Sequence, residues 1–122
     1  MKFRIYYDST DAGGIVYHTE YIKFCERARS EIFFRNGIYF ENEGYVVKQL
    51  KANFIASAKL ADIIDVKTKI SSHTKVKIDL IQEIYLNDKK IFELEVTVVY
   101  VKNGKIAKIP DSHIKVINAY ES

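Results

Sequence analysis

The residues best suited to chemistry lie in one stretch near the start of the chain. Asp11 supplies a carboxylate and His18 an imidazole, and two adjacent glycines, Gly13 and Gly14, stand between them. Glycine lets a backbone approach another group closely, and the first N–H groups of a helix lack internal partners and favour negative charge. A carboxylate facing such donors is suited to hydrolysis, either as a nucleophile or as a base for water.

Each of these residues also has an ordinary structural explanation. An Asp in such a turn commonly forms an Asx turn or caps a helix, and a His at the mouth of a helix is commonly a polar cap or surface residue. Tyr7 falls on the inward parity of the preceding strand, which favours core packing. If its hydroxyl is buried, the carboxylate of Asp11 is the nearest candidate partner. Taken singly, each residue favours the structural explanation.

The elements that must position this stretch are a strand before it and a helix after it. Residues 2–8 alternate in hydropathy and predict a strand, and a turn covers residues 9–18. A helical pattern begins at about Thr19, and Asn36-Gly37 is typical of its end. Its apolar stripe consists of Tyr21, Cys25, Ala28 and Ile32, widened by Ile22 and Phe24. Its polar residues Glu26, Arg27 and Arg29 are assigned to a solvated face or to an ion-pair group between subunits.

A series of strands follows the helix. They are predicted at residues 45–56, 63–71, 75–86, 90–102 and 105–109. Asn103-Gly104 is a strong hairpin signal, and Asp111 is expected to cap a short terminal helix after Pro110. This order predicts an α+β fold with one long helix across a curled antiparallel sheet. Apolar residues on the opposite parity, Ile81, Val99 and Val101, leave surface for a partner subunit.

Composition narrows the class of protein. The 122 residues predict one domain over residues 1–122, and 48% hydrophobic and 29% charged residues are typical of a soluble globular protein. A net charge of +3 without a basic, aromatic-rich strand excludes a nucleic-acid footprint. Cys25 is the only cysteine, and His73 and His113 are far from His18 in sequence, so no metal site or disulfide is expected. No signal peptide or membrane-spanning run is recognised, and we expect a cytoplasmic protein.

The segment from Tyr7 to Arg29, Y-D-S-T-D-A-G-G-I-V-Y-H-T-E-Y-I-K-F-C-E-R-A-R, closely resembles the signature of the YbgC-type acyl-CoA thioesterases. These belong to the 4-hydroxybenzoyl-CoA thioesterase group of hotdog-fold proteins. The resemblance is dense over residues 4–31 and looser but collinear to about Pro110, through Tyr45-Val46-Val47 and the segment 57–62. It implies a hotdog fold, with an antiparallel sheet of five or six strands wrapped around one long helix.

The resemblance also implies an activity and a site. It implies hydrolysis of acyl-CoA, and of acyl carrier protein thioesters, with no cofactor beyond the coenzyme A of the substrate. It carries the catalytic carboxylate onto Asp11, places a carbonyl-polarising backbone N–H near His18, and makes Tyr7 a neighbour of the site. The residues expected to contact substrate are Gly13, Gly14, Val16 and Tyr17. Homodimers with interfacial active sites, which often pair again as tetramers, and a place in lipid metabolism are further implications.

Two departures from the family pattern lie next to the site. The family usually has an acid two positions before the catalytic Asp, where this chain has Ser9, and a small residue followed by Asn after the histidine, where this chain has Thr19-Glu20. Two other functions stay open: a non-catalytic acyl-thioester-binding or scaffold protein, and a hotdog dehydratase, against which the Asp-Ala-Gly-Gly turn argues. Tyr17, Phe24 and Phe54 are candidates for the acyl pocket.

Overall fold

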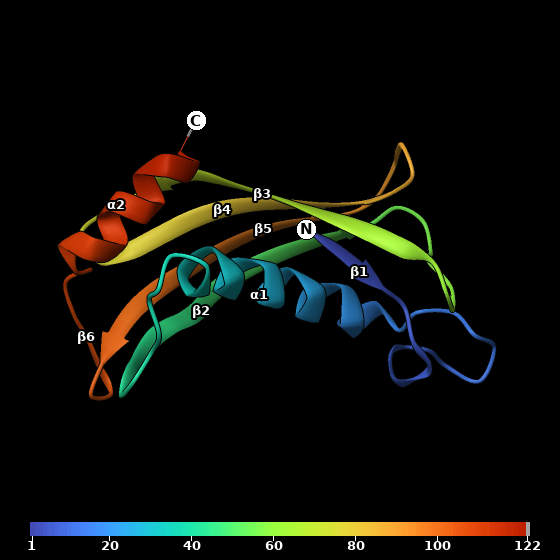
Figure 1. The fold of residues 1–122 in the computed structure, drawn as a ribbon, viewed down its shortest axis with the longest axis horizontal. Helices are drawn as coiled ribbons and strands as arrows, with labels where there is room; N and C mark the ends of the chain where they lie inside the picture. Colours follow the sequence, from blue (N-terminus) through green and yellow to red (C-terminus); the bar gives the residue numbers. More distant parts are fainter. Residues whose placement is uncertain (122) are drawn as a thin grey trace.

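The computed structural model describes residues 1–121. All strands pair antiparallel in one six-stranded sheet of order β1-β3-β4-β5-β2, with β6 beside β5 (Figure 1). The strands are β1 (Lys2–Arg4), β2 (Glu43–Phe54), β3 (Ile63–His73), β4 (Lys77–Leu86), β5 (Lys89–Lys102) and β6 (Lys105–Ile106). The helices are α1 (His18–Phe34), α2 (Asp111–Tyr120) and a 3-10 helix at Tyr7–Ser9. The predicted α+β class is confirmed.

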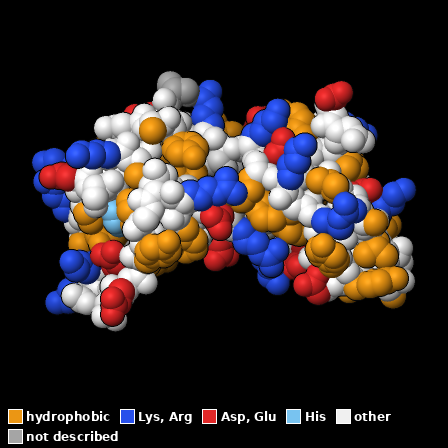
Figure 2. All heavy atoms as spheres, in the orientation of Figure 1, with side chains coloured by type: hydrophobic (Ala, Val, Ile, Leu, Met, Phe, Trp, Pro, Cys, Tyr) orange, Lys and Arg blue, Asp and Glu red, His pale blue; other side chains and the backbone are white. Residues whose placement is uncertain are grey.

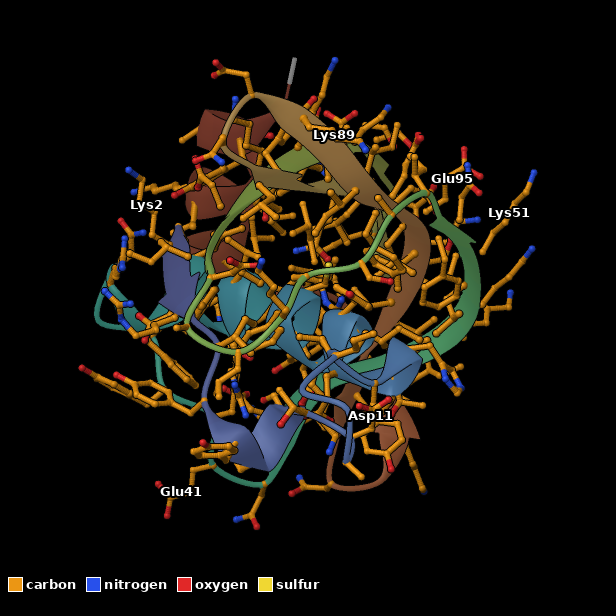
Figure 3. All side chains as sticks on the ribbon, turned by 90° about the vertical axis from the view of Figure 1, so that its right-hand side faces the viewer. Lys2, Asp11, Glu41, Lys51, Lys89 and Glu95 are labelled. Carbon is orange, nitrogen blue, oxygen red and sulfur yellow. The ribbon has the colours of Figure 1, made fainter. Side chains whose placement is uncertain are left out.

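The sheet curves around α1, as the view from the end where this helix begins shows (Figure 3). The predicted apolar stripe of α1 faces the sheet, and Cys25 at its centre has no exposed surface. The strands contribute the alternate residues of their inner face to the same core, among them Ile64, Ile84, Phe92 and Leu94. Burial of each such side chain stabilises the fold by about 1.5–3 kcal/mol, so the helix and the sheet depend on each other for stability.

The turns and helix ends fall where the sequence predicts them. Gly37 has a φ of 75° just after α1, which is the left-handed conformation expected there. Asn103 and Gly104 have φ values of 52° and 78° in the hairpin that joins β5 to β6, and such values characterise a type I′ turn. The predicted strands 45–56, 63–71, 75–86 and 90–102 each agree with a strand of the structure to within two residues at either end.

The predicted first strand, residues 2–8, is too long. β1 pairs with β3 only as far as Arg4, which lies opposite Ile63, and the chain then turns into the 3-10 helix. The inward parity expected for Tyr7 therefore does not apply. Its side chain is 80% exposed, and the prediction that it packs in the core was wrong.

The C-terminal part also differs from its prediction. β6 covers only Lys105–Ile106 rather than residues 105–109, because the chain leaves β5 and its Ile109 N–H donates to the Lys75 carbonyl at 2.8 Å. Pro110 occupies the N-cap position of α2, and Asp111 lies in the first turn without a capping hydrogen bond, so the predicted Asp111 cap was wrong. The expected terminal helix itself is confirmed.

Two further predictions concern membrane-spanning segments and the bounds of the domain. None of the helices within residues 1–121 is long and apolar enough to cross a membrane. The single domain predicted over residues 1–122 stays a prediction, and its last residue, Ser122, lies outside the described residues.

Candidate active site

Asp11 lies in a small closed loop between the 3-10 helix and α1. The loop is closed by an antiparallel bridge between Thr10 and Val16, and by the Asp11 N–H, which donates to the Ile15 carbonyl at 2.9 Å. Oδ1 of Asp11 accepts the N–H groups of Gly13 (2.9 Å) and Ile15 (3.1 Å). This is the Asx-turn arrangement. The other carboxylate oxygen has no hydrogen-bond partner within residues 1–121, so it is available to a ligand.

The two glycines serve this loop in different ways. Gly14 adopts a φ of +77°, a conformation that L side chains rarely adopt, and its N–H donates to the Asp11 carbonyl at 3.0 Å. A Cβ at position 13 would stand 3.3 Å from Oδ1 of Asp11, which is a tight contact. A side chain at Gly13 would therefore crowd the carboxylate, and one at Gly14 would strain the turn.

The segment 57–62, between β2 and β3, is hydrogen-bonded to the loop and holds it in place. Val16 N–H donates to the Ala58 carbonyl (3.1 Å), and the Gly14 carbonyl accepts the Leu60 N–H (2.9 Å). The Ala58 N–H donates to the hydroxyl of Tyr21, a buried residue of α1, at 2.9 Å. The loop, the segment 57–62 and the helix thus form one hydrogen-bonded unit. The family-like segment noted in the sequence lies beside the site.

The start of α1 stands beside this loop (Figure 1). Tyr17 is the N-cap residue, and its own N–H donates to the Ser9 carbonyl at 3.2 Å. The N–H groups of His18 and Thr19 have no partner among the backbone hydrogen bonds of residues 1–121, as expected for the first turn of a helix. The exposed ring of His18 packs edge-on against Phe54 of β2, with centroids 6.0 Å apart. Free donors, an imidazole and a carboxylate therefore occupy one end of the molecule.

The two departures from the family pattern meet in space. Glu20 is buried in the first turn of α1, and its carboxylate pairs with Nζ of Lys23 at 2.9 Å. Hydrogen bonds from Lys23 and then from the Ser9 hydroxyl lower the pKa of Glu20, against the opposing effect of burial. Ser9 is itself buried. The Glu20 carboxylate is therefore ionised and paired at the junction of the loop and the helix, so it is not a free charge beside the Asp11 site. The sequence alone does not predict this contact.

The other predicted site residues differ in exposure. Tyr17 is 52% exposed, and Tyr7 is still more exposed, whereas Val16 is buried with its N–H already bound to Ala58. Figure 2 shows hydrophobic side chains gathered at this end of the molecule, where the exposed ones include Tyr6, Tyr7, Ile15 and Tyr17. Catalytic roles for Asp11, His18 and Tyr7, and substrate contacts for Gly13, Gly14, Val16 and Tyr17, stay predictions.

Two other side chains of α1 bear on the chemistry. Burial raises the pKa of the Cys25 thiol to about 12, which makes it a poor nucleophile. Arg29, assigned in the sequence to a solvated face or an ion-pair group, is instead half-buried and donates from Nη1 to the side-chain oxygen of Gln82 at 3.0 Å. Over the described part of the chain, no group of three or more His, Cys, Asp or Glu side chains is arranged to hold a metal ion.

Comparison with known proteins identifies the family of the chain. The family model described as thioesterase-like superfamily matches residues 6–117. The chain belongs to this superfamily. Its match includes the Asp11 loop, the segment 57–62 and all of α1, so the predicted resemblance and the hotdog fold are confirmed.

Three relatives make the likeness more specific. The acyl-CoA thioesterase YbgC of Helicobacter pylori is 45% identical over 87 residues, which cover 70% of this chain and 65% of that protein. The acyl-CoA thioester hydrolase YbgC of Escherichia coli is 36% identical over 104 residues, covering 80% and 78%. The crystal structure of a probable thioesterase from Bartonella henselae has a TM-score of 0.82 at 27% identity, over 90% of this chain and 97% of that one. The matched region thus spans a little less than two-thirds of the Helicobacter protein.

Proposed function

We propose that this chain is an acyl-CoA thioesterase that hydrolyses acyl-CoA to a free acid and coenzyme A. The observation that carries the proposal is the Asp11 carboxylate, which two loop N–H groups fix through one oxygen while the other oxygen is free beside the start of α1. The names of the YbgC relatives support the same activity. The non-catalytic binding protein and the dehydratase, which the sequence left open, gain no support from these relatives.

The chemistry follows from the positions of the groups. The thioester carbonyl oxygen accepts hydrogen bonds from the first N–H groups of α1, near His18, where the helix end also favours the negative charge that develops. Each such donor typically contributes about 3 kcal/mol to catalysis in other hydrolases. The free oxygen of Asp11 then acts in one of two ways, as a nucleophile on the carbonyl carbon or as a base for an attacking water, and the C–S bond is cleaved in both.

In the nucleophilic route, Asp11 attacks the carbonyl carbon, the thiolate of coenzyme A leaves, and water hydrolyses the resulting anhydride to regenerate the carboxylate. In the general-base route, Asp11 takes a proton from a water whose oxygen attacks the same carbon. A thiolate is a stable leaving group, so neither route requires a strong general acid. His18 stands at the helix start, where it orients the thioester or transfers a proton.

We propose that the enzyme is a homodimer built through β2, and that two dimers pair as a tetramer. β2 is a long edge strand whose far side carries no strand among the described residues, and such edges are usually covered. Its exposed apolar side chains include Val46, Val47, Leu50 and Phe54. The residues first expected at the interface, Ile81, Val99 and Val101, are only half-exposed, and Ile81 lies between Lys69 and Glu95.

This edge would bring a second subunit to the site. In a two-fold pairing of antiparallel β2 strands, the start of one β2 lies beside the end of the other. The end of β2 holds Phe54, which packs against His18. The partner strand would therefore border the Asp11 site. Leu50→Lys should give a monomer with much reduced turnover, measured by light scattering and thiol release, whereas an unchanged dimer would exclude pairing through this edge.

The proposal also covers a second class of substrate, the cellular location and the metabolic role of the enzyme. Acyl carrier protein thioesters are proposed as second substrates, with a cytoplasmic enzyme of lipid metabolism as the setting. The test of the function is hydrolysis of an acyl-CoA panel of increasing chain length, followed by free thiol. We expect turnover of at least one chain length. Tight binding of acyl-CoA by the folded protein without any turnover would instead support the binding or scaffold protein, and hydration of enoyl thioesters would support the dehydratase.

A further inference from the structure

A cavity of about 220 Å³ lies between the second half of α1 and the inner face of the sheet, away from the Asp11 loop. Its apolar wall includes Phe33, Tyr45, Ile70, Ile78, Leu80 and Val98. Its polar wall lies on α1, where Glu26, Arg29 and Ser30 line it. The cavity is thus mostly apolar with one polar side, an arrangement suited to an amphipathic small molecule.

Arg29 is held in this wall by a rigid partner. Among residues 1–121, its one hydrogen bond runs from Nη1 to Oε1 of Gln82, at 3.0 Å. Gln82 is fully buried, and its Nε2 donates both to the Cys25 carbonyl (2.9 Å) and to Oγ1 of Thr68 (3.0 Å). These bonds fix the orientation of the Gln82 amide. Gln82 therefore anchors the guanidinium but supplies no negative charge to it.

The charge of Arg29 lacks a matching anion. None of the ion pairs within residues 1–121 includes Arg29. Burial lowers its pKa, and the charge of Glu26, one turn earlier on the helix, opposes that change without forming an ion pair. A buried cation is costly unless an anion pairs with it. A guanidinium also presents five N–H donors in a planar fork, and within the described part of the chain only one of them donates a hydrogen bond.

We propose that this cavity binds an apolar molecule that carries a carboxylate, and that Arg29 recognises the carboxylate. The planar fork of a guanidinium matches a carboxylate in a bidentate pair, and the apolar wall would contact the hydrocarbon body. Two sources supply this chemistry. One is the free acid that thioester hydrolysis releases, and the other is a carboxylate at the far end of an acyl group still attached to coenzyme A.

The position of the cavity bears on the second source. Arg29 follows His18 by 11 residues, which is about 17 Å along a helix, so the cavity is separate from the loop of the same subunit. Gly44 and Tyr45, at the start of β2, also line it. In the proposed β2 dimer, that start lies beside the end of the partner's β2 and hence near the partner's site. The second source therefore rests on the proposed function, whereas binding of a free acid does not.

The first experiment measures binding by calorimetry in the Asp11→Asn background, so that turnover plays no part. The probes are straight-chain carboxylates from butanoate to decanoate, each paired with its neutral amide. We expect at least one carboxylate to bind about 10- to 100-fold more tightly than its amide. Arg29→Gln should abolish this difference, whereas Arg27→Gln, on the exposed face of the same helix, should preserve it. Equal binding of acid and amide, no binding, or full discrimination by Arg29→Gln would overturn the proposal.

Two further measurements cover the case in which Arg29→Gln does not fold, and distinguish the two sources of the carboxylate. Arg29→Lys keeps the charge but not the fork, so it should fold and retain a reduced preference for the acid even if Arg29→Gln does not fold. The second measurement compares kcat/KM for the mono-CoA thioester of a dicarboxylic acid and for its methyl ester. If kcat/KM is higher for the acid than for the methyl ester, and Arg29→Lys reduces that difference, the ligand is the carboxylate at the far end of the acyl group. If kcat/KM is the same for both, the ligand is the released acid. Binding that depends on Arg29 in a protein without thioesterase activity would contradict the proposed function alone.

Discussion

The loop before α1 and the second half of α1 each hold a charged group in place, but in opposite ways. In the loop, the Asp11 carboxylate is fixed by backbone N–H groups from residues two and four positions later. In the second half, Arg29 is fixed by Gln82, 53 residues away on β4. The first arrangement is local and leaves a carboxylate oxygen free, which suits chemistry. The second depends on packing and leaves a cation facing a cavity, which suits recognition.

This contrast explains what the sequence could and could not predict. The Asx turn at Asp11, the glycines after it and the helix start are all set by neighbours within a few residues, so the sequence predicts them. The burial of Arg29 depends on how α1 meets β4, and on a Gln at a position where strand parity predicts only an inward side chain. The sequence therefore assigns Arg29 to a solvated face or to an ion-pair group between subunits, and it predicts neither the cavity nor the hydrogen bond to Gln82.

The largest expected effect on stability concerns the junction of Ser9 and Glu20. Ser9→Asp would place a second buried carboxylate against that of Glu20, and we expect a loss of about 3 kcal/mol in the free energy of unfolding. Adding Glu20→Asn should restore most of that loss, because the acid then has a neutral hydrogen-bonding neighbour. Urea unfolding of the two single variants and the double variant measures the coupling. Additive losses would show that the two side chains do not interact.

A smaller effect is expected at the turn of the Asp11 loop. Gly14 needs a φ of +77°, so Gly14→Ala should cost about 1 kcal/mol in stability and lower the turnover by displacing the loop. Gly44 has open space around it and no positive φ, and Gly44→Ala is the matched control for stability. Equal melting temperatures for the two variants would contradict the strain assigned to this turn.

The smallest effect is a pH dependence at the far end of the molecule. His113 of α2 is buried, and its Nδ1 lies 2.9 Å from the Tyr45 hydroxyl, among the rings of Phe33, Phe40 and Tyr100. Burial lowers the pKa of His113, with the charge of Glu43 opposing that change.

Because the folded protein binds this proton less readily than the unfolded chain, stability should fall as the pH drops below the ordinary value of 6.5. The contribution of Glu20, whose pKa is also lowered, should be lost only below about its ordinary 4.5. Unfolding in urea between pH 7.5 and 5 should show a decline that His113→Gln removes. A decline of the same size in His113→Gln would assign it to other groups.

The strands and the helices show the same limit on prediction. Long alternating or helical patterns predict the four long strands and α1 to within about two residues at each end. They do so because each of these elements buries one face, and that burial requires the apolar spacing that the sequence shows. The parity of Tyr7 fails because β1 stops where its partner β3 begins, at Ile63 opposite Arg4. Only the paired strand reveals that boundary. The contact between Ser9 and Glu20 is likewise invisible until the loop folds back on the helix.

The most direct test of the central claim compares two neighbouring acids, Asp11 of the loop and Asp8 of the 3-10 helix before it. Asp11→Asn keeps an oxygen that accepts the Gly13 and Ile15 N–H groups, so the loop should fold, but it removes the carboxylate. Asp8→Asn changes an exposed acid three residues earlier. We predict that kcat/KM for acyl-CoA hydrolysis falls at least about 100-fold in Asp11→Asn and stays near the parent value in Asp8→Asn. Full activity in Asp11→Asn would contradict the assignment of the catalytic carboxylate.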